Sequence, residues 1–388
     1  MRIIIYTGKG GVGKTSMAAA AACKLASKGR KVLIMSTDQA HSLGDSFDVK
    51  LNDEPRQICD NLQALEIDTT LETKKAWGSL QEYIKTIINK NKHSDDSIEV
   101  DEALAVPTLD ELFAMLKILD AYTDDACDDL IIDCAPTGET LALLRFPERL
   151  GQMVKRLLPV VRAFTFTAGI AVSLKTNVPK PSDKVFRDFG KLNDRLMKLQ
   201  KILSDPEITS IRIVTTTERI VLEEARRNYT WMHMYDFNVD AVIINRIYPE
   251  DAMSGYFSSW TKTQADNMKL AQESFPGVKI FKMYLKDHEL RGLDSLRAAA
   301  GEVYGDENLE DIFVKENIFS VAEEDGHTVM NIELPFTKKE EISVGQMEGD
   351  ILLTIRNERR RFQIPENVKE RNLDHFEYKN GLLKVYLL

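Results

Sequence analysis

Long uncharged apolar runs are missing from this sequence of 388 residues. Its most apolar stretch, 163–174, carries Thr and Ser and falls short of the roughly 18 residues that indicate a membrane-spanning helix. No secretory leader is recognisable either, because Met1 and Arg2 lead directly into IIIY, which is typical of a first buried strand. We therefore expect a cytoplasmic protein, or one in an equivalent reducing compartment such as an organelle stroma.

Cysteine is scarce, and positive charge is in the minority. The four cysteines, Cys23, Cys59, Cys127 and Cys134, form no CxxC pair, which gives no support to a zinc finger or a thioredoxin-like site. We interpret them as reduced, structural thiols. The net charge of −10 excludes a strong positive field over the whole chain, so a general nucleic-acid binder is not expected. A local basic patch remains compatible with this charge.

Short runs rich in Val and Ile alternate with helical patterns over residues 1–304. Strands are expected at 2–6, 31–36, 62–67, 130–134, 211–215, 241–245 and 278–283. Helices are expected at 14–28, 110–122 and 218–229, among others. This alternation predicts an α/β fold with a mostly parallel sheet, helices on both of its faces, and ligands at the carboxyl ends of the strands.

Two regions, 71–122 and 147–203, are richer in helical patterns and predict a helical subdomain beside the sheet. After about residue 305 the helical periodicity disappears, and from Phe319 short alternating strands follow, with a turn signal at Asn380-Gly381. The sequence therefore predicts two domains: an α/β domain over 1–304, and a small all-β sandwich over 315–388.

A phosphate-binding motif, GxxxxGK[ST], spans Gly8–Thr15 between the first expected strand and the first expected helix. Its glycines let backbone N–H groups point at phosphate oxygens, and the following helix adds partial positive charge. We expect Lys14 to bridge the β- and γ-phosphates of ATP, and the Thr15 hydroxyl to bind Mg²⁺. The residues expected to contact the nucleotide here are Gly10, Gly11, Val12, Gly13, Lys14, Thr15 and Ser16.

A second lysine, Lys9, stands early in the same loop. With it, GKGGVGKT resembles the deviant Walker A loop of dimeric P-loop ATPases, which include the nitrogenase iron protein, the MinD/ParA proteins and the ArsA/tail-anchored-protein-targeting ATPases. The resemblance implies a homodimer in which Lys9 crosses the interface and acts on the partner's nucleotide, as an arginine finger does. The alternative interpretation of Lys9 is a solvated loop lysine.

Two further stretches resemble the ArsA/targeting branch. STDQAHSL, from Ser36, is similar to its switch I sequence STDPAHSL, which implies that Asp38 orients and deprotonates the attacking water. DCAPTGET, from Asp133, is similar to its switch II sequence DTAPTGHT, which implies that Asp133 holds Mg²⁺ through water. The chain departs from the family at Gln39, Cys134 and Glu139, where Pro, Thr and His are usual.

A third stretch, 241–251, looks like the family's strand ending in Asn-Arg, which implies that Asn245 and Arg246 lie near adenine. The later segment 282–297 resembles the family's adenine loop. The resemblance covers roughly residues 1–304. The eukaryotic targeting members join their dimer with zinc held by a CxxC pair, but the corresponding stretch 251–264 has no cysteine, so no zinc is expected here.

The carboxyl-terminal sandwich resembles an α-crystallin domain, and we expect either a structural cap or a chaperone-like holding role. In targeting members, helical segments form an apolar groove for a client's transmembrane helix. Here 110–119 and 157–174, with Met115, Met153 and Met197, are apolar enough for such a groove, although core packing is the alternative.

The sequence therefore predicts a homodimeric Mg²⁺-ATPase whose nucleotide state controls binding of a hydrophobic protein client, with a membrane receptor as a further partner. One rival is the energising subunit of an anion or arsenite pump. Another is a constitutive chaperone that nucleotide merely locks in shape. A MinD-like membrane-positioning ATPase is disfavoured, because this sequence ends in strand patterns rather than a basic amphipathic helix.

Overall fold

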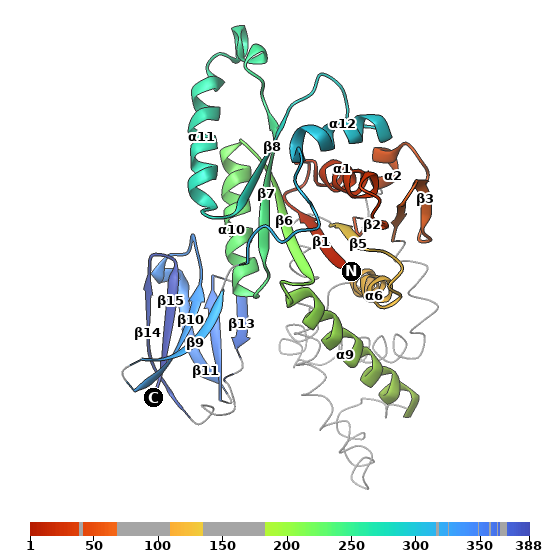
Figure 1. Ribbon diagram of the computed structural model, residues 1–388. Coiled ribbons are helices and arrows are strands. Elements are labelled where there is room, and N and C mark those ends of the chain that lie inside the picture. Colours follow the sequence, from red (N-terminus) through yellow and green to blue (C-terminus); the bar gives the residue numbers. More distant parts are fainter. Residues whose placement is uncertain are drawn as a thin grey trace, which may run out of the picture.

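An eight-stranded sheet organises the first part of the computed structural model, which describes residues 1–38, 42–67, 109–134, 183–315, 318–324, 326–347, 349–356, 358–362, 364 and 371–388. In spatial order its strands are β3 (Arg56–Cys59), β4 (Leu62–Glu66), β2 (Val32–Ser36), β5 (Asp129–Asp133), β1 (Arg2–Thr7), β6 (Thr209–Thr216), β7 (Val239–Ile247) and β8 (Lys279–Tyr284) (Figure 1). All neighbours pair in parallel except β3 with β4. The predicted α/β class is confirmed, while the half-exposed edge strand β3 escaped prediction because it shows no apolar alternation.

Helices cover both faces of this sheet, as the sequence predicts. One face packs against α1 (Lys14–Ser27), α2 (Ser42–Phe47) and α12 (Leu293–Tyr304). The other packs against α6 (Leu109–Thr123), α9 (Asp183–Ser204), α10 (Arg219–Met234) and α11 (Trp260–Ser274). Alternate residues of β1 divide between the two cores, with Ile3 and Ile5 on one side and Ile4 and Tyr6 on the other. Within the described residues, no helix is both long and apolar enough to cross a membrane.

The expected helical subdomain falls largely on 68–108 and 135–182, which lie outside the described residues. Of its described parts, Leu116, Ile118 and Leu119 of α6 are buried, the latter two in the core beneath the sheet. These side chains therefore follow the core interpretation rather than the groove interpretation. Met197 on α9 is exposed, whereas Met153 belongs to the undescribed part.

A two-layer β-sandwich follows. One sheet has the order β14 (Leu373–Lys379), β15 (Leu382–Leu387), β10 (His327–Glu333) and β9 (Phe319–Glu324); the other has β11 (Ile342–Met347), β12 (Asp350–Ile355) and β13 (Glu358–Phe362). The rings of Phe319 and Phe362 stack at 5.6 Å between the two layers. The predicted turn joins β14 to β15, and both Asn380 and Gly381 have positive φ there. The domain limits of 304 and 315 stay a prediction.

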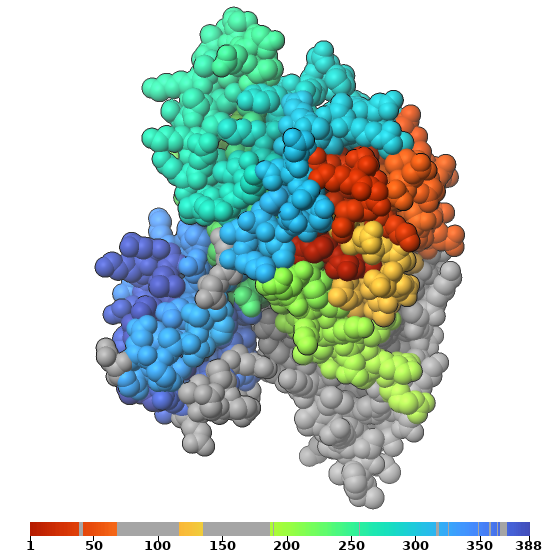
Figure 2. All heavy atoms as spheres, in the orientation of Figure 1, coloured from red at the N-terminus to blue at the C-terminus, as the bar shows by residue number. Residues whose placement is uncertain are grey.

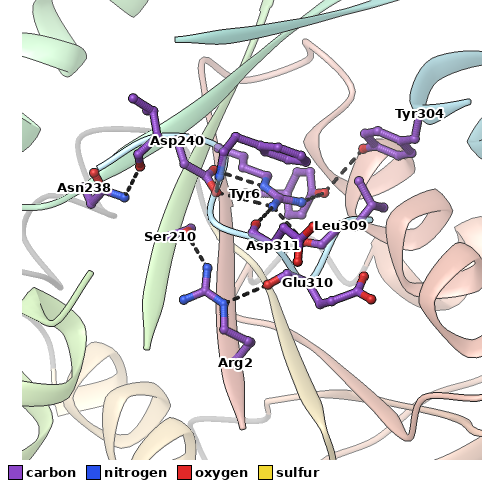
Figure 3. Close-up of polar contacts among 12 residues, drawn as sticks. Arg2, Tyr6, Ser210, Asn238, Asp240, Tyr304, Leu309, Glu310 and Asp311 are labelled. Atoms are coloured by element: carbon purple, nitrogen blue, oxygen red, sulfur yellow. Dashed lines mark hydrogen bonds and ion pairs between the residues drawn. The ribbon is translucent and has the colours of Figure 1, made fainter. Parts of the chain in front are cut away.

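The segment 305–315, called the strap below, contacts residues at the beginning of β1, β6 and β7 (Figure 3). On the face shown in Figure 2, the blue atoms of this part of the chain lie beside the red N-terminal part. The main contact is made by Arg212 of β6, which is fully buried. Its guanidinium pairs with Asp240 at 3.1 Å and donates to the carbonyl of Leu309 in the strap at 2.7 Å. Arg2 donates to the carbonyl of Glu310 at 3.1 Å. Buried charges are stable only with such partners, so the strap is fixed to the sheet rather than hanging free.

The sandwich itself packs against α10. The Arg226 guanidinium lies 4.3 Å from the centre of the Phe336 ring, and the Thr230 hydroxyl donates to the Pro335 carbonyl. The Tyr235 hydroxyl donates to the carbonyl of Arg359 at 3.0 Å. Apolar residues of both parts form one continuous core, so α10 is a wall shared by the sheet and the sandwich.

Candidate nucleotide and metal site

Three parallel strands end at the same point of the sheet edge. The register places both Tyr6 of β1 and Ser36 of β2 beside Asp133, the last residue of β5. Segments that follow these strands therefore begin next to one another, and they are the three segments in which the sequence predicts phosphate, water and metal contacts.

The loop between β1 and α1 needs glycine at two positions for steric reasons. A Cβ on Gly8 would lie 2.2 Å from the carbonyl oxygen of Val214, and one on Gly13 would lie 2.3 Å from the amide nitrogen of Asn245. Gly13 also has a φ of 91°, which side-chain-bearing residues rarely adopt. The loop thus lies directly on the ends of β6 and β7, with no room for a larger residue at either glycine.

The first turn of α1 is arranged for an anion. Gly13 precedes it without any side-chain cap, and the turn carries no acidic residue. Free backbone N–H groups and the helix dipole therefore favour a bound phosphate at this point. Lys14 is 6% exposed, so its charge lies at the base of the loop rather than in bulk water. Thr15 and Ser16 are half-buried beside it.

Asp133 is surrounded by hydroxyl groups. Its side chain accepts a hydrogen bond from Thr15, and its Oδ2 accepts one from the Ser36 hydroxyl at 3.3 Å. The Thr15 hydroxyl oxygen lies 3.1 Å from that of Ser42, the first residue of α2. Among the described residues, Oδ1 of Asp133 is buried without a hydrogen-bond partner.

Burial raises the pKa of the Asp133 carboxyl to about 7, with Asp38 acting in the same direction, against the lowering effects of Thr15, Lys14 and Ser36. A buried carboxylate with one unpartnered oxygen is costly unless a cation compensates it. Hydroxyl and carboxylate oxygens are hard ligands of the kind that Mg²⁺ prefers. The residues present therefore fit a magnesium ion held by Thr15 and, through water, by Asp133.

Asp38 is half-buried at the start of the segment after β2, and its N–H donates to the Ser36 hydroxyl at 3.2 Å. It is close enough to Asp133 to influence the pKa of that carboxyl. The structure therefore brings Asp38 close to Asp133. Gln39 and Glu139, the departures from the family sequences, lie outside the described residues.

Lys9 does not extend freely into solvent. Its ammonium donates to the carboxylate of Glu224 on α10 of the same chain, with the two side chains 41% and 22% exposed. Because β6, which precedes α10, is the neighbour of β1, the helix starts beside the loop. Neither lysine role considered from the sequence, solvated or crossing to a partner, includes this contact.

Asn245 lies beneath the phosphate loop. It is 5% exposed, its amide donates to the Val12 carbonyl at 2.8 Å, and its Oδ1 accepts from the N–H of Arg246. The exposed Arg246 has a φ of 55°. Arg291, in the expected adenine loop, pairs instead with Asp48 after α2. A contact of Asn245 or Arg246 with adenine stays a prediction.

Three site residues were missed by sequence reasoning. Ser36 carries a weak signal, since it ends a buried strand beside a metal-binding segment. Ser42 lies within the quoted switch I stretch, but nothing in its spacing indicates a contact with Thr15. Glu224 has no local signal at all, because its partner Lys9 is 215 positions away.

Comparisons with known proteins find matches over both parts of the chain. A family model described as "Anion-transporting ATPase" matches residues 1–305, and one described as "HSP20-like domain found in ArsA" matches 325–387. The chain is 34% identical to the "Putative arsenical pump-driving ATPase 1" of Aquifex aeolicus, with 96% of each chain covered. It is 26% identical to the "ATPase ASNA1 homolog 1" of Paramecium tetraurelia, covering 76% of this chain and 90% of that one.

We predict that Asp133→Asn stabilises the ligand-free protein increasingly as the pH rises. The folded chain holds a proton at Asp133 up to a pH of about 7, whereas an unfolded Asp releases it near 3.8. The free energy of unfolding therefore falls through that window and keeps the full cost above it. A neutral Asn removes this cost, on the order of a few kcal/mol at most. Thermal unfolding between pH 5 and 8, without nucleotide or Mg²⁺, measures it.

Asp129→Asn is the matched control, because Asp129 is equally buried at the other end of β5 but accepts from Arg30 at 2.9 Å. Removing this paired charge should destabilise the protein across the same pH range. If the difference in melting temperature between Asp133→Asn and the parent does not change with pH, the pKa of Asp133 is not raised in the folded protein.

Proposed function

The chain belongs to the ArsA family of ATPases, and from that premise we propose that it works as a homodimer that hydrolyses Mg-ATP at two facing sites. The observation that carries the proposal is the unpartnered, buried Oδ1 of Asp133 beside the Thr15 hydroxyl and the uncapped start of α1. This arrangement provides for a metal ion and a phosphate chain together.

Each residue of the site has a distinct task in this proposal. The N–H groups from Gly10 to Ser16 bind the phosphate oxygens, and Lys14 neutralises charge on the β- and γ-phosphates. Thr15 and Asp133 hold Mg²⁺, which when bound offsets charge on the phosphates. Asp38 orients the attacking water in line with the γ-phosphate and accepts a proton from that water.

Lys9 gives the proposal its dimeric character. It stands on an outer loop with 41% of its side chain exposed, so a second subunit can reach it. A cation delivered across the interface stabilises charge on the transferring phosphoryl group only when the dimer is closed. Hydrolysis then depends on association, and nucleotide state sets the shape of the dimer.

We further propose that this shape change controls the binding of a hydrophobic protein client, namely a transmembrane segment that is delivered to a membrane receptor. Support comes from the similarity to proteins named ASNA1 homologs and from the HSP20-like match over 325–387. The sandwich packs on α10, the helix whose Glu224 contacts Lys9 of the nucleotide loop, so it is positioned to respond to the ATPase cycle.

A pump-energising role is the second candidate, and the name of the relative from Aquifex aeolicus favours it. The thiols give it little support. None of the four cysteines, all of them described, forms a disulfide, and among the described residues no group of three His, Cys, Asp or Glu side chains could hold a metal. Stimulation of hydrolysis by arsenite would favour the pump role over the client role.

Asp38→Asn is expected to lower the rate of ATP hydrolysis by at least about 100-fold, since amide nitrogen and oxygen cannot accept the proton of the attacking water. Nucleotide affinity should stay within about threefold of the parent, because Asp38 contacts water rather than ATP. Single-turnover hydrolysis and equilibrium binding of a fluorescent ATP analogue measure the two effects. Turnover at the parent rate would remove Asp38 from the catalytic role.

Lys9→Ala is expected to abolish the rise in specific ATPase activity with protein concentration, because the cation supplied by the second subunit is lost. Activity per chain should stay at the level of the dilute parent protein. Titrating protein at saturating Mg-ATP measures this, with light scattering to report the dimer. A parent whose specific activity does not depend on concentration would contradict the dimer.

Protein purified from cells without nucleotide is expected to retain hydrophobic polypeptides, and to release most of them when Mg-ATP is added. Mass spectrometry of the bound and released fractions identifies them, and Asp38→Asn serves as the matched control that binds ATP without cycling. Bound material lacking apolar segments, or retention that ignores ATP in both proteins, would contradict a nucleotide-controlled client.

A further inference from the structure

The Lys9–Glu224 ion pair joins the phosphate loop to the helix that carries the sandwich. Lys9 donates to Glu224 within one chain, and a side chain engaged in this way points at its own α10. To act on a nucleotide in another subunit, it must leave that contact. The pair therefore belongs to a state that precedes closure of the dimer.

We propose that Glu224 is a positioning residue that holds Lys9 against its own subunit until a second copy of this chain closes over the nucleotide. This inference rests on the proposed action of Lys9 across the dimer. It adds a residue whose charge sets how much protein is needed for closure, and so keeps hydrolysis low in isolated chains.

Helix α10 is a firm support for such a contact. Leu222 and Tyr229 are buried against the sheet, which fixes the rotation of the helix about its axis and its distance from the sheet. Two positions along from Glu224, Arg226 points to another side of the helix, where its guanidinium covers the Phe336 ring of the sandwich. Thr230 and the sandwich are joined one turn further on. The carboxylate is thus presented to the loop by a helix that is held on its other sides.

The strength of the pair sets the size of the effect. With side chains 41% and 22% exposed, it belongs with pairs measured at a fraction of a kcal/mol to about 1 kcal/mol. A tenfold change in an equilibrium constant corresponds to about 1.4 kcal/mol. Loss of the pair should therefore shift the equilibrium between bound and released Lys9 within one chain by about two- to fivefold. The contact is strong enough to bias Lys9 and weak enough for nucleotide and a second subunit to displace.

The test compares Glu224→Gln with the parent in two measurements. The first is the rate at which Lys9 is acylated by an amine-reactive ester in dilute, nucleotide-free protein, followed by peptide mass spectrometry. The second is the protein concentration that gives half-maximal specific ATPase activity. We expect Lys9 labelling to rise about two- to fivefold. The half-maximal concentration should fall by the square of that factor, about four- to 25-fold, because closure of the dimer breaks one pair in each subunit. Both differences should shrink with added salt.

Glu223→Gln is the matched control. Glu223 is the preceding carboxylate of α10 and pairs with Arg226 at 2.9 Å, so its loss changes the net charge equally without touching the loop. It should leave both measurements at parent values. In a Lys9→Ala background, where specific activity no longer rises with concentration, light scattering reports the dimer instead. Glu224→Gln should not alter dimer formation in that background, because the group that it releases is absent.

Several results would overturn the inference and are distinguishable from failure of the proposed function. Unchanged labelling in Glu224→Gln means that Glu224 does not hold Lys9. Increased labelling with an unchanged half-maximal concentration means that the pair does not oppose closure. In both cases, the ATPase dimer stands if Lys9→Ala alone removes the concentration dependence. If Lys9→Ala leaves that dependence intact, the trans role and this inference fall together.

Discussion

The buried carboxylate of Asp133 is the interaction on which the site depends. Parallel pairing places it beside Tyr6 and Ser36, where water is excluded and its pKa rises to about 7. Such a group is stabilised only by cations and hydrogen-bond donors, and the chain places Lys14 and two hydroxyls around it. Ligand-free protein thus keeps an electrostatic cost at this sheet edge, which a bound cation would relieve.

Much of the fold and of the candidate site could be predicted from the sequence, because the relevant signals are local. The glycines of the phosphate loop, the apolar run that ends at Asp133 and the alternation of strands with helices each depend on neighbouring residues. They predicted the fold class and the family correctly. The part that escaped prediction arises from packing between distant segments. The Asn245 amide donates to the Val12 carbonyl, the Ser42 and Thr15 hydroxyls form a hydrogen bond, and Lys9 pairs with Glu224. No spacing in the sequence indicates any of these contacts.

The helix α10 connects two parts of the molecule that the sequence presents as separate. Its beginning lies against the nucleotide loop through Glu224, and its end lies beneath the sandwich through Tyr235 and the Met234 carbonyl, which accepts from Arg360. A single helix that contacts both parts provides a contiguous physical connection between them. The sandwich is therefore better described as part of the body of the ATPase than as an appended module.

The strap makes the first sheet depend on residues that follow its last helix. Leu309 supplies a carbonyl to Arg212, and the centre of the Phe313 ring lies 4.8 Å from the guanidinium. A chain cut after α12 would lose both contacts and would uncover the Arg212–Asp240 ion pair, which is fully buried in the intact protein. The edge of the sheet is thus completed by a segment that lies outside the alternating strands and helices.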